Sequence, residues 1–121
     1  MQKGKFYEDK AVSYLKIKGY VILKRNFRSP FGEIDIIAKD KGYTCFIEVK
    51  ARNHNYLVSG KEAIDFRKIE KIKKTALFYV SGNSNRFFRF DVLEIIQDRD
   101  FYRYDLIKGA FDCTDSGWKN R

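Results

Sequence analysis

The chain has 121 residues, of which 44% are hydrophobic and 17% aromatic, so it suits one folded domain and is too apolar for general disorder. Lys and Arg number 25 against 16 Asp and Glu, which gives a formal net charge of +9. A field of this sign attracts polyanions, and phosphate backbones are the commonest of these, although ribosomal contacts and acidic membrane surfaces would be served equally well.

Several classes of protein are excluded or disfavoured. No apolar run approaches the roughly 20 residues of a membrane-spanning helix, and no apolar stretch follows Lys3 and Lys5 as in a secretory signal. Cys45 and Cys113 form neither a disulfide framework nor a C-x-x-C spacing, so we expect reduced thiols in a cytoplasmic protein. Glycine-rich phosphate loops are missing from the sequence, which disfavours nucleotide-driven motors and dinucleotide enzymes.

The predicted elements begin with a helix over residues 5–18, in which Ala11, Val12 and Leu15 form one apolar stripe and Gly19 marks the end. A strand over 20–28 follows, closed by a turn at 29–32. Residues 33–38 and 43–50 are two short β-rich runs around a polar, glycine-containing loop, which predicts a β-hairpin.

The second half of the chain predicts a helix followed by two strands. Residues 53–60 are expected to be a loop, after which Ser59 and Glu62 match a capping box at the start of the helix. The apolar stripe of that helix consists of Ile69, Ile72, Ala76, Leu77 and Val80. After a break at 81–85, the two strands are expected over 87–96 and 102–108.

The expected fold is therefore α/β, a mixed β-sheet flanked by helices in the order α-β-β-β-α-β-β. Residues 1–111 are expected to form a single domain, and 112–121, which have no periodicity, an irregular C-terminal tail. Phe87, Phe88 and Phe90 are expected in the core rather than on a surface that stacks bases.

Three charged residues carry the chemical interest of the hairpin. Asp35 lies in its first strand, and Glu48 and Lys50 lie in its second, alternating with Ile47 and Val49. Because side chains alternate faces along a strand, Glu48 and Lys50 share a face, and the turn brings Asp35 alongside them. The alternative interpretation is a cross-strand salt-bridge network on an exposed sheet face, which contributes little.

Two carboxylates about 4 Å apart repel by roughly 4 kcal/mol at an effective dielectric constant near 20, so a cation is needed between them. Mg²⁺ takes one or two carboxylates together with waters and phosphate oxygens. Lys50 is placed to orient a water or to stabilise charge that develops on a phosphate. The triad therefore predicts metal-assisted hydrolysis of a phosphodiester.

Asp35 followed by Glu48-Val49-Lys50 resembles the Asp…(Asp/Glu)-x-Lys core of the PD-(D/E)XK nuclease superfamily. More closely, the chain resembles the YraN-like family of small bacterial proteins over about residues 4–111. The segments that carry this resemblance are Asn26-Phe27-Arg28, Gly32-Glu33-Ile34-Asp35-Ile36-Ile37-Ala38, Phe46-Ile47-Glu48-Val49-Lys50-Ala51-Arg52 and Phe90-Asp91-Val92, with Gly19-Tyr20 and Ala110-Phe111 towards the ends. Ile34 stands where the superfamily name has Pro, as it does in the YraN-like pattern.

The resemblance implies a restriction-endonuclease-like core related to Holliday-junction resolvases, with Mg²⁺ or Mn²⁺ as cofactor. Its metal ligands would be Asp35, Glu48, the backbone carbonyl of Val49 and Glu8, and Lys50 would complete the catalytic set. Residues that would bind the nucleic acid are Arg28, Arg52 and Lys68. The triad, Glu8 and the net charge of +9 together lead us to expect endonucleolytic cleavage of DNA, with branched DNA as one candidate substrate. A homodimer is one candidate assembly, because cutting two strands symmetrically favours a two-fold partner.

Some residues keep two interpretations. Glu8 stands on the apolar face of the first helix, where it either helps to hold the metal or pairs with a lysine or arginine at the sheet edge. Glu33 either reaches the same site as Asp35 or lies in solvent. His54, the one histidine, is expected to be an incidental loop residue, which argues against a zinc site. The whole chain keeps an alternative as well, a catalytically silent module that binds nucleic acid.

Overall fold

The computed structural model describes residues 3–53, 66–81 and 87–111. The predictions for the loop at 54–60, the capping box of Ser59 and Glu62, His54, the segment 82–85 and the tail 112–121 lie outside these ranges. Within them, no helix is long and apolar enough to span a membrane.

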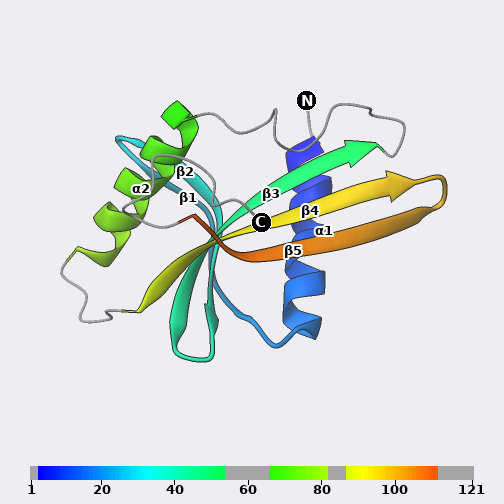
Figure 1. Cartoon of the computed structure of the whole chain (residues 1–121), viewed down its shortest axis with the longest axis horizontal. Coiled ribbons are helices and arrows are strands. Elements are labelled where there is room, and N and C mark those ends of the chain that lie inside the picture. Colours follow the sequence, from blue (N-terminus) through cyan, green and yellow to red (C-terminus); the bar gives the residue numbers. More distant parts are fainter. Residues whose placement is uncertain (1–2, 54–65, 82–86, 112–121) are drawn as a thin grey trace.

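The predicted order of elements is confirmed (Figure 1). All five strands belong to one mixed sheet in the order β1-β2-β3-β4-β5, in which β3 and β4 are parallel and every other neighbouring pair is antiparallel. The elements are α1 (Lys3–Ile17), β1 (Val21–Ser29), β2 (Gly32–Asp40), β3 (Tyr43–Asn53), α2 (Phe66–Val80), β4 (Phe88–Asp98) and β5 (Phe101–Phe111). The parallel pair follows from α2, because a crossover connection returns the chain to the same end of the sheet.

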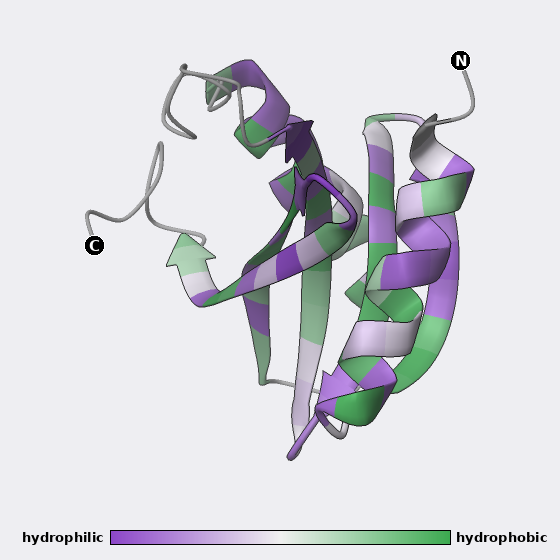
Figure 2. Cartoon of the chain, turned by 90° about the vertical axis from the view of Figure 1, so that its right-hand side faces the viewer, coloured by the Kyte–Doolittle hydropathy of each residue, from purple (hydrophilic) through white to green (hydrophobic). Residues whose placement is uncertain are grey.

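Helix α1 ends where the sequence predicts. Gly19 takes a positive φ of 96°, its N–H donates to the Lys16 carbonyl at 3.0 Å, and the Tyr20 N–H donates to the Leu15 carbonyl at 2.9 Å. These two bonds are the Schellman motif, which satisfies carbonyls at the end of a helix and favours glycine in the left-handed conformation. The chain then enters β1, so α1 lies alongside the strands (Figure 2).

The two helices cover opposite faces of the sheet, so the core has two parts. The buried α1 stripe of Ala11, Val12 and Leu15 packs against one face. The residues that it meets there are Ile36, Ala38, Cys45, Ile47, Leu93 and Ile95. Full burial of a single side chain such as Leu15 contributes about 2 kcal/mol relative to exposure.

On the other face, Ile69, Ile72 and Ala76 of α2 pack against buried residues of β2, β3, β4 and β5, with the partly buried Phe27 of β1 beside them. The buried strand residues are Ile34, Ile37, Phe46, Phe90, Val92, Ala110 and Phe111. Two predictions about the core are wrong. Leu77 is 51% exposed and Phe87 is 63% exposed, because one lies beyond the apolar stripe of α2 and the other precedes β4.

Candidate active site

Asp35 lies where two paired strands separate. The register of β2 with β3 runs from Asp40↔Tyr43 to Ile36↔Ile47 and stops there. The Val49 N–H, further along β3, instead donates to Oδ2 of Asp35 at 2.8 Å. A backbone donor in the middle of a sheet needs a partner, so the Asp35 carboxylate takes the place of the missing ladder bond.

Glu48 and Lys50 share one face of β3, as predicted. The neighbouring Ile47 is buried against α1, and Val49 packs against the same cluster. Glu48 points to the α2 side, where it forms an ion pair with Nζ of Lys68. The candidate site therefore combines β2, β3 and α2, and Lys68 joins it through its ion pair with Glu48.

Two ionisable groups of the site, Asp35 and Lys50, have pKa values shifted from their usual ones. Burial, and then the nearby charge of Glu48, raise the pKa of Asp35 to about 7, although the Val49 N–H bond acts in the opposite direction. Burial, followed by the neighbouring Lys68, lowers the pKa of Lys50. Both shifts have the same origin, since desolvation disfavours the charged form of either group. Perturbed groups of this kind concentrate at functional sites.

A cavity of about 380 Å³ opens on the α1 side of Asp35. Its lining includes Asp35, Glu8, Glu33, Arg28 and Asn26. Glu48 does not line this cavity. The Asp35 carboxylate thus lies between the cavity on one side and Glu48 and Lys68 on the other.

Glu8 is buried, as its place on the apolar face of α1 predicts, and it is bound by arginine. Arg25 of the edge strand β1 donates to Oε1 of Glu8 from Nε at 3.1 Å and from Nη2 at 2.7 Å. The same guanidinium also pairs with Asp9. Of the two interpretations of Glu8, the structure contains the ion pair at the sheet edge, while Glu8 and Asp35 still share the cavity. A direct bond to a metal stays a prediction.

The residues predicted to bind nucleic acid differ in their surroundings. The Arg28 side chain is 77% exposed at the cavity and lies 3.6 Å from Glu33, which is itself half exposed. Arg52 is largely buried and donates from Nη2 to Oε2 of Glu94 at 2.8 Å. The exposed Arg28 side chain is therefore directly accessible to a phosphate, whereas Arg52 would first have to break its ion pair with Glu94.

The donor set suits a hard divalent cation. Within the described ranges, no group of three or more His, Cys, Asp or Glu side chains converges as a ready-made metal site. Asp35 of β2 and Glu48 of β3 offer carboxylate oxygens, and Val49 of β3 offers its backbone carbonyl oxygen. All of these ligands are oxygen atoms. Mg²⁺ commonly binds through one or two carboxylates and keeps several waters, so these residues fit it.

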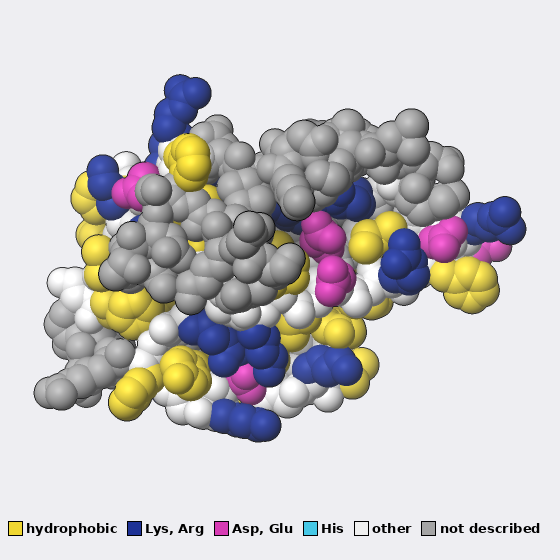
Figure 3. All heavy atoms as spheres, viewed as in Figure 1, with side chains coloured by type: hydrophobic (Ala, Val, Ile, Leu, Met, Phe, Trp, Pro, Cys, Tyr) yellow, Lys and Arg dark blue, Asp and Glu magenta, His cyan; other side chains and the backbone are white. Residues whose placement is uncertain are grey.

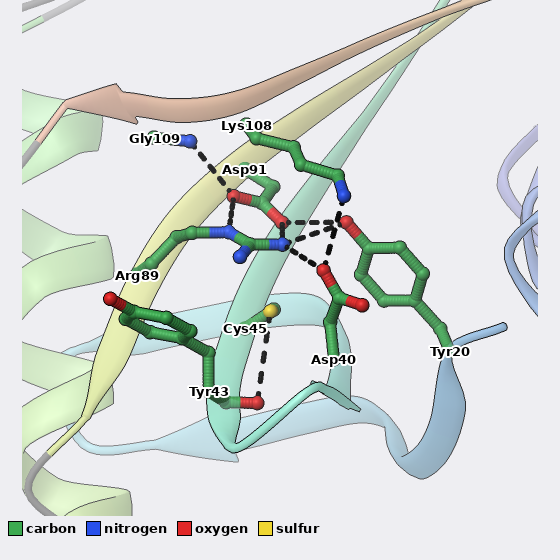
Figure 4. Close-up of polar contacts among 8 residues, drawn as sticks. All are labelled: Tyr20, Asp40, Tyr43, Cys45, Arg89, Asp91, Lys108 and Gly109. Carbon is green, nitrogen blue, oxygen red and sulfur yellow. Dashed lines mark hydrogen bonds and ion pairs between the residues drawn. The ribbon is translucent and has the colours of Figure 1, made fainter. Parts of the chain in front are cut away.

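A second polar cluster, absent from the sequence-based prediction, lies at the other end of β2 and β4 (Figure 4). Asp91 is 1% exposed, and it accepts hydrogen bonds from Arg89 Nε at 2.8 Å, from the Gly109 N–H at 3.0 Å and from Tyr20 Oη at 3.1 Å. Arg89 also donates to Asp40 at 2.7 Å, and Lys108 lies 3.2 Å from the same carboxylate.

The charges of this second cluster balance, with Asp40 and Asp91 against Arg89 and Lys108. Burial, and then the charge of Asp91, raise the pKa of Cys45 to about 12, so this thiol stays protonated and unreactive. The cluster joins the α1–β1 connection, the end of β2, β4 and β5, which is a structural role. Asp91 inside the apolar run from Phe90 to Val92 was the signal for it, since a carboxylate in a buried strand requires donors.

Comparison with known proteins places these features in a family. The model of "Uncharacterised protein family UPF0102" matches residues 7–95. A UPF0102 protein of Clostridium botulinum (strain Hall) is 52% identical over 113 residues, which cover 89% of this chain and 92% of that protein. A UPF0102 protein of Sulfurihydrogenibium sp. (strain YO3AOP1) is 48% identical over 103 residues, covering 84% and 90% respectively.

Proposed function

The chain belongs to the uncharacterised protein family UPF0102, and we propose that it is a divalent-metal-dependent endonuclease of the PD-(D/E)XK kind that hydrolyses phosphodiester bonds in DNA. The observation that supports this proposal best is the position of Asp35. A half-buried carboxylate with a pKa raised by desolvation and by Glu48 is a site at which a divalent cation is stabilising.

Each residue of the site has its own role in the proposed reaction. Asp35 and Glu48, with the Val49 carbonyl, would hold Mg²⁺ or Mn²⁺, which when bound supplies a Lewis acid and lowers the pKa of a coordinated water. Lys50 extends from the same face as Glu48 and stabilises negative charge on the phosphate oxygens. Hydrolysis adds water across one P–O bond and leaves a phosphate monoester and a hydroxyl group.

Lys68 and Arg28 have supporting roles in this proposal. Lys68 compensates Glu48 before substrate arrives, and because its side chain is 51% exposed, its ammonium can turn from the carboxylate to a phosphate once a cation replaces it. Arg28 lies at the exposed mouth of the cavity beside Asp35 and binds the backbone. Glu8 holds Arg25 and reaches the cavity, so it positions β1 against α1 and can accept a hydrogen bond from a bound water.

The test uses purified protein with end-labelled single-stranded, flapped and four-way-branched DNA in Mg²⁺, in Mn²⁺ and in EDTA. We expect metal-dependent cleavage that Asp35→Asn and Glu48→Gln each lower by at least a hundredfold, the scale of losing an essential electrostatic group. Asp100→Asn, in the exposed β4–β5 turn, is the matched control and should cleave normally. Metal-independent cleavage, or cleavage that survives Asp35→Asn, contradicts the proposal.

A second candidate, a silent nucleic-acid-binding module of the same fold, has an observation in its favour. Glu48, Glu8 and Arg52 all have ion-pair partners within the chain, so these charges are already compensated without metal or substrate. This candidate predicts DNA binding that is unchanged by Glu48→Gln and no heat of Mn²⁺ binding in calorimetry. The endonuclease predicts a Mn²⁺ signal that Asp35→Asn and Glu48→Gln weaken.

A further inference from the structure

Aromatic and basic side chains lie together on the surface formed by α2 and the β1–β2 turn. Phe31, in the turn, is 47% exposed, and Phe78, in the last turn of α2, is 48% exposed. Their ring centroids are 6.4 Å apart, with the rings at 70°. Lys71 and Lys74 are exposed on the same helix. We call Phe31, Phe78, Lys71 and Lys74 the aromatic–basic ledge.

The ledge is fixed by contacts between its two elements. Ser29 Oγ and Thr75 Oγ1 are 3.0 Å apart in a hydrogen bond that ties the turn to α2. At Gly32, an added Cβ would lie only 3.2 Å from Cβ of Lys71, so the backbone here closely approaches the helix. Phe27 of β1 packs against Phe78, with ring centroids 6.3 Å apart. A ligand therefore meets rings that are already ordered.

The ledge is connected to the candidate active site along one helix. Lys68 of α2 is paired with Glu48, and Phe78 follows ten residues later, about 15 Å along the axis at 1.5 Å per residue. Lys71, Lys74 and Phe78 are spaced by three and four residues and are all exposed, so they form one stripe. Figure 3 shows Lys and Arg beside hydrophobic side chains at the edge of the molecule where α2 lies.

We propose that the aromatic–basic ledge binds unpaired nucleotides of a single-stranded DNA segment next to the cleaved bond, a step that takes its substrate class from the proposed function. Bases stack on Phe31 and Phe78, and backbone phosphates lie against Lys71 and Lys74. Proteins that bind single strands without sequence preference usually combine positively charged side chains along the backbone with exposed aromatic rings on which bases stack. A duplex keeps its bases stacked internally and cannot use the two rings.

Charge favours this occupant over a second copy of the chain. Each copy carries a net charge of +9, and the ledge itself includes Lys71 and Lys74, so two ledges face to face would repel each other. Lys71 and Lys74 have no ion-pair partner within 3–53, 66–81 and 87–111. A polyanion with flat apolar faces complements both the charge and the rings.

The experiment measures DNA binding by fluorescence anisotropy in EDTA, so that hydrolysis plays no part. The probes are a labelled oligothymidylate of about fifteen nucleotides and a blunt duplex of similar length. The variants are Phe31→Ala, Phe78→Ala, Phe78→Leu, which keeps apolar bulk without a ring, and Lys71→Ala combined with Lys74→Ala. Phe101→Ala, an aromatic that is 73% exposed in β5, and Lys16→Ala in α1 are the matched controls.

We expect Phe78→Ala and Phe78→Leu each to weaken single-strand binding about tenfold and duplex binding less than twofold. The double lysine variant should lower the slope of log affinity against log salt by about 1.4 on single strands, which is two phosphates at about 0.7 each. Phe101→Ala and Lys16→Ala should match the wild type. A circular dichroism melt of each variant separates a binding defect from unfolding.

Three results overturn the proposal. They are no binding of single strands by the wild type, equal loss on single strands and duplex, and loss of self-association in Phe78→Ala with DNA affinity intact. The proposed function can fail separately. Unchanged binding by the ledge variants of a protein that does cleave removes the ledge alone, whereas ring-dependent binding without cleavage removes only the hydrolysis.

Discussion

At the scale of single residues, Asp35 combines a structural bond with an unfavourable charge. Its carboxylate accepts the Val49 N–H, yet burial and Glu48 raise its pKa to about 7, far above the value near 3.9 of an unfolded chain. Between these two values the folded state binds more protons than the unfolded state. The stability of the metal-free protein therefore falls as the pH rises through this window.

Asp35→Asn should remove that loss, because an amide keeps a carbonyl for the Val49 N–H and never ionises. We expect the melting temperature of the metal-free variant to exceed that of the wild type by on the order of 4 °C at pH 8, the effect of about 1 kcal/mol. The difference should shrink towards pH 4, where the wild-type carboxyl is protonated. Calorimetric melts at several pH values check this, with Asp100→Asn as control; a pH-independent difference contradicts it.

Divalent cations should act on the same residue in the opposite direction. Mn²⁺ at a hundred times its dissociation constant stabilises a protein that binds it only when folded by about 2.7 kcal/mol. We expect that rise in the wild type at pH 8 and a much smaller one in Asp35→Asn, so that the order of melting temperatures reverses when metal is added. Melts with and without Mn²⁺, and with EDTA restored, provide the measurement. Equal stabilisation of both proteins would falsify a metal site at Asp35.

Asp91 is a buried charge that its neighbours compensate, since Arg89, Tyr20 and the Gly109 N–H all donate to it. Asp91→Asn should destabilise the protein by about 3 kcal/mol in urea unfolding, because Arg89, whose side chain is only 18% exposed, keeps one carboxylate fewer. Asp100→Asn is the control, as Asp100 is exposed in the β4–β5 turn, and it should change stability by less than about 1 kcal/mol. Similar effects of the two changes would mean that the second cluster is not structural.

Much of the site followed from strand periodicity. The alternation of Ile47, Glu48, Val49 and Lys50 predicts their faces correctly, because the hydrophobic pattern fixes which side of a strand is buried. The Asp35 bond to Val49 did not follow, and the sequence, which left Glu8 between a metal and an ion pair at the sheet edge, did not identify Arg25 as its partner. Both depend on where strands separate and on which edge strand lies beside α1, and these are tertiary facts with no local signal.

At the scale of elements, the β1–β2 turn and α2 pack closely against each other. Gly32→Ala should destabilise the protein by about 1–2 kcal/mol, since its new Cβ would lie 3.2 Å from Cβ of Lys71, which the helix backbone holds in place. Gly4→Ala is the control, with nothing within 4 Å of the added atom and a helical position that favours alanine. Urea unfolding should show a loss for the first and no loss for the second.

The boundaries of the elements were predictable where the chain has local signals. Gly19 ends α1 through its positive φ, and the glycine-containing loop after Asp40 closes the β2–β3 hairpin. The strands extend further than expected, to Asn53 and to Phe111, because pairing with a neighbouring strand continues beyond the apolar pattern. The exposure of Leu77 also escaped prediction, since helical periodicity alone does not reveal where the sheet beneath α2 ends.

At the scale of the whole molecule, the C-terminal end of β5 completes the core on the α2 face. Ala110 and Phe111 are buried there, and the Phe111 ring stacks on Phe90 with centroids 4.8 Å apart and planes at 15°. This strand is an edge of the sheet, so its last residues have only one neighbouring strand to hold them. Their contribution is therefore mainly side-chain burial.

The position of these two residues makes the prediction of one domain over 1–111 testable. A chain that ends at Phe111 should unfold with the same cooperativity and within about 1 kcal/mol of the full chain. One that ends at Gly109 loses the Phe111 side chain, and large-to-small changes of this kind cost about 3–5 kcal/mol. Urea unfolding of both, followed by circular dichroism, measures the difference. A large loss already at Phe111 would place part of the domain within 112–121 and move its boundary to the end of the chain.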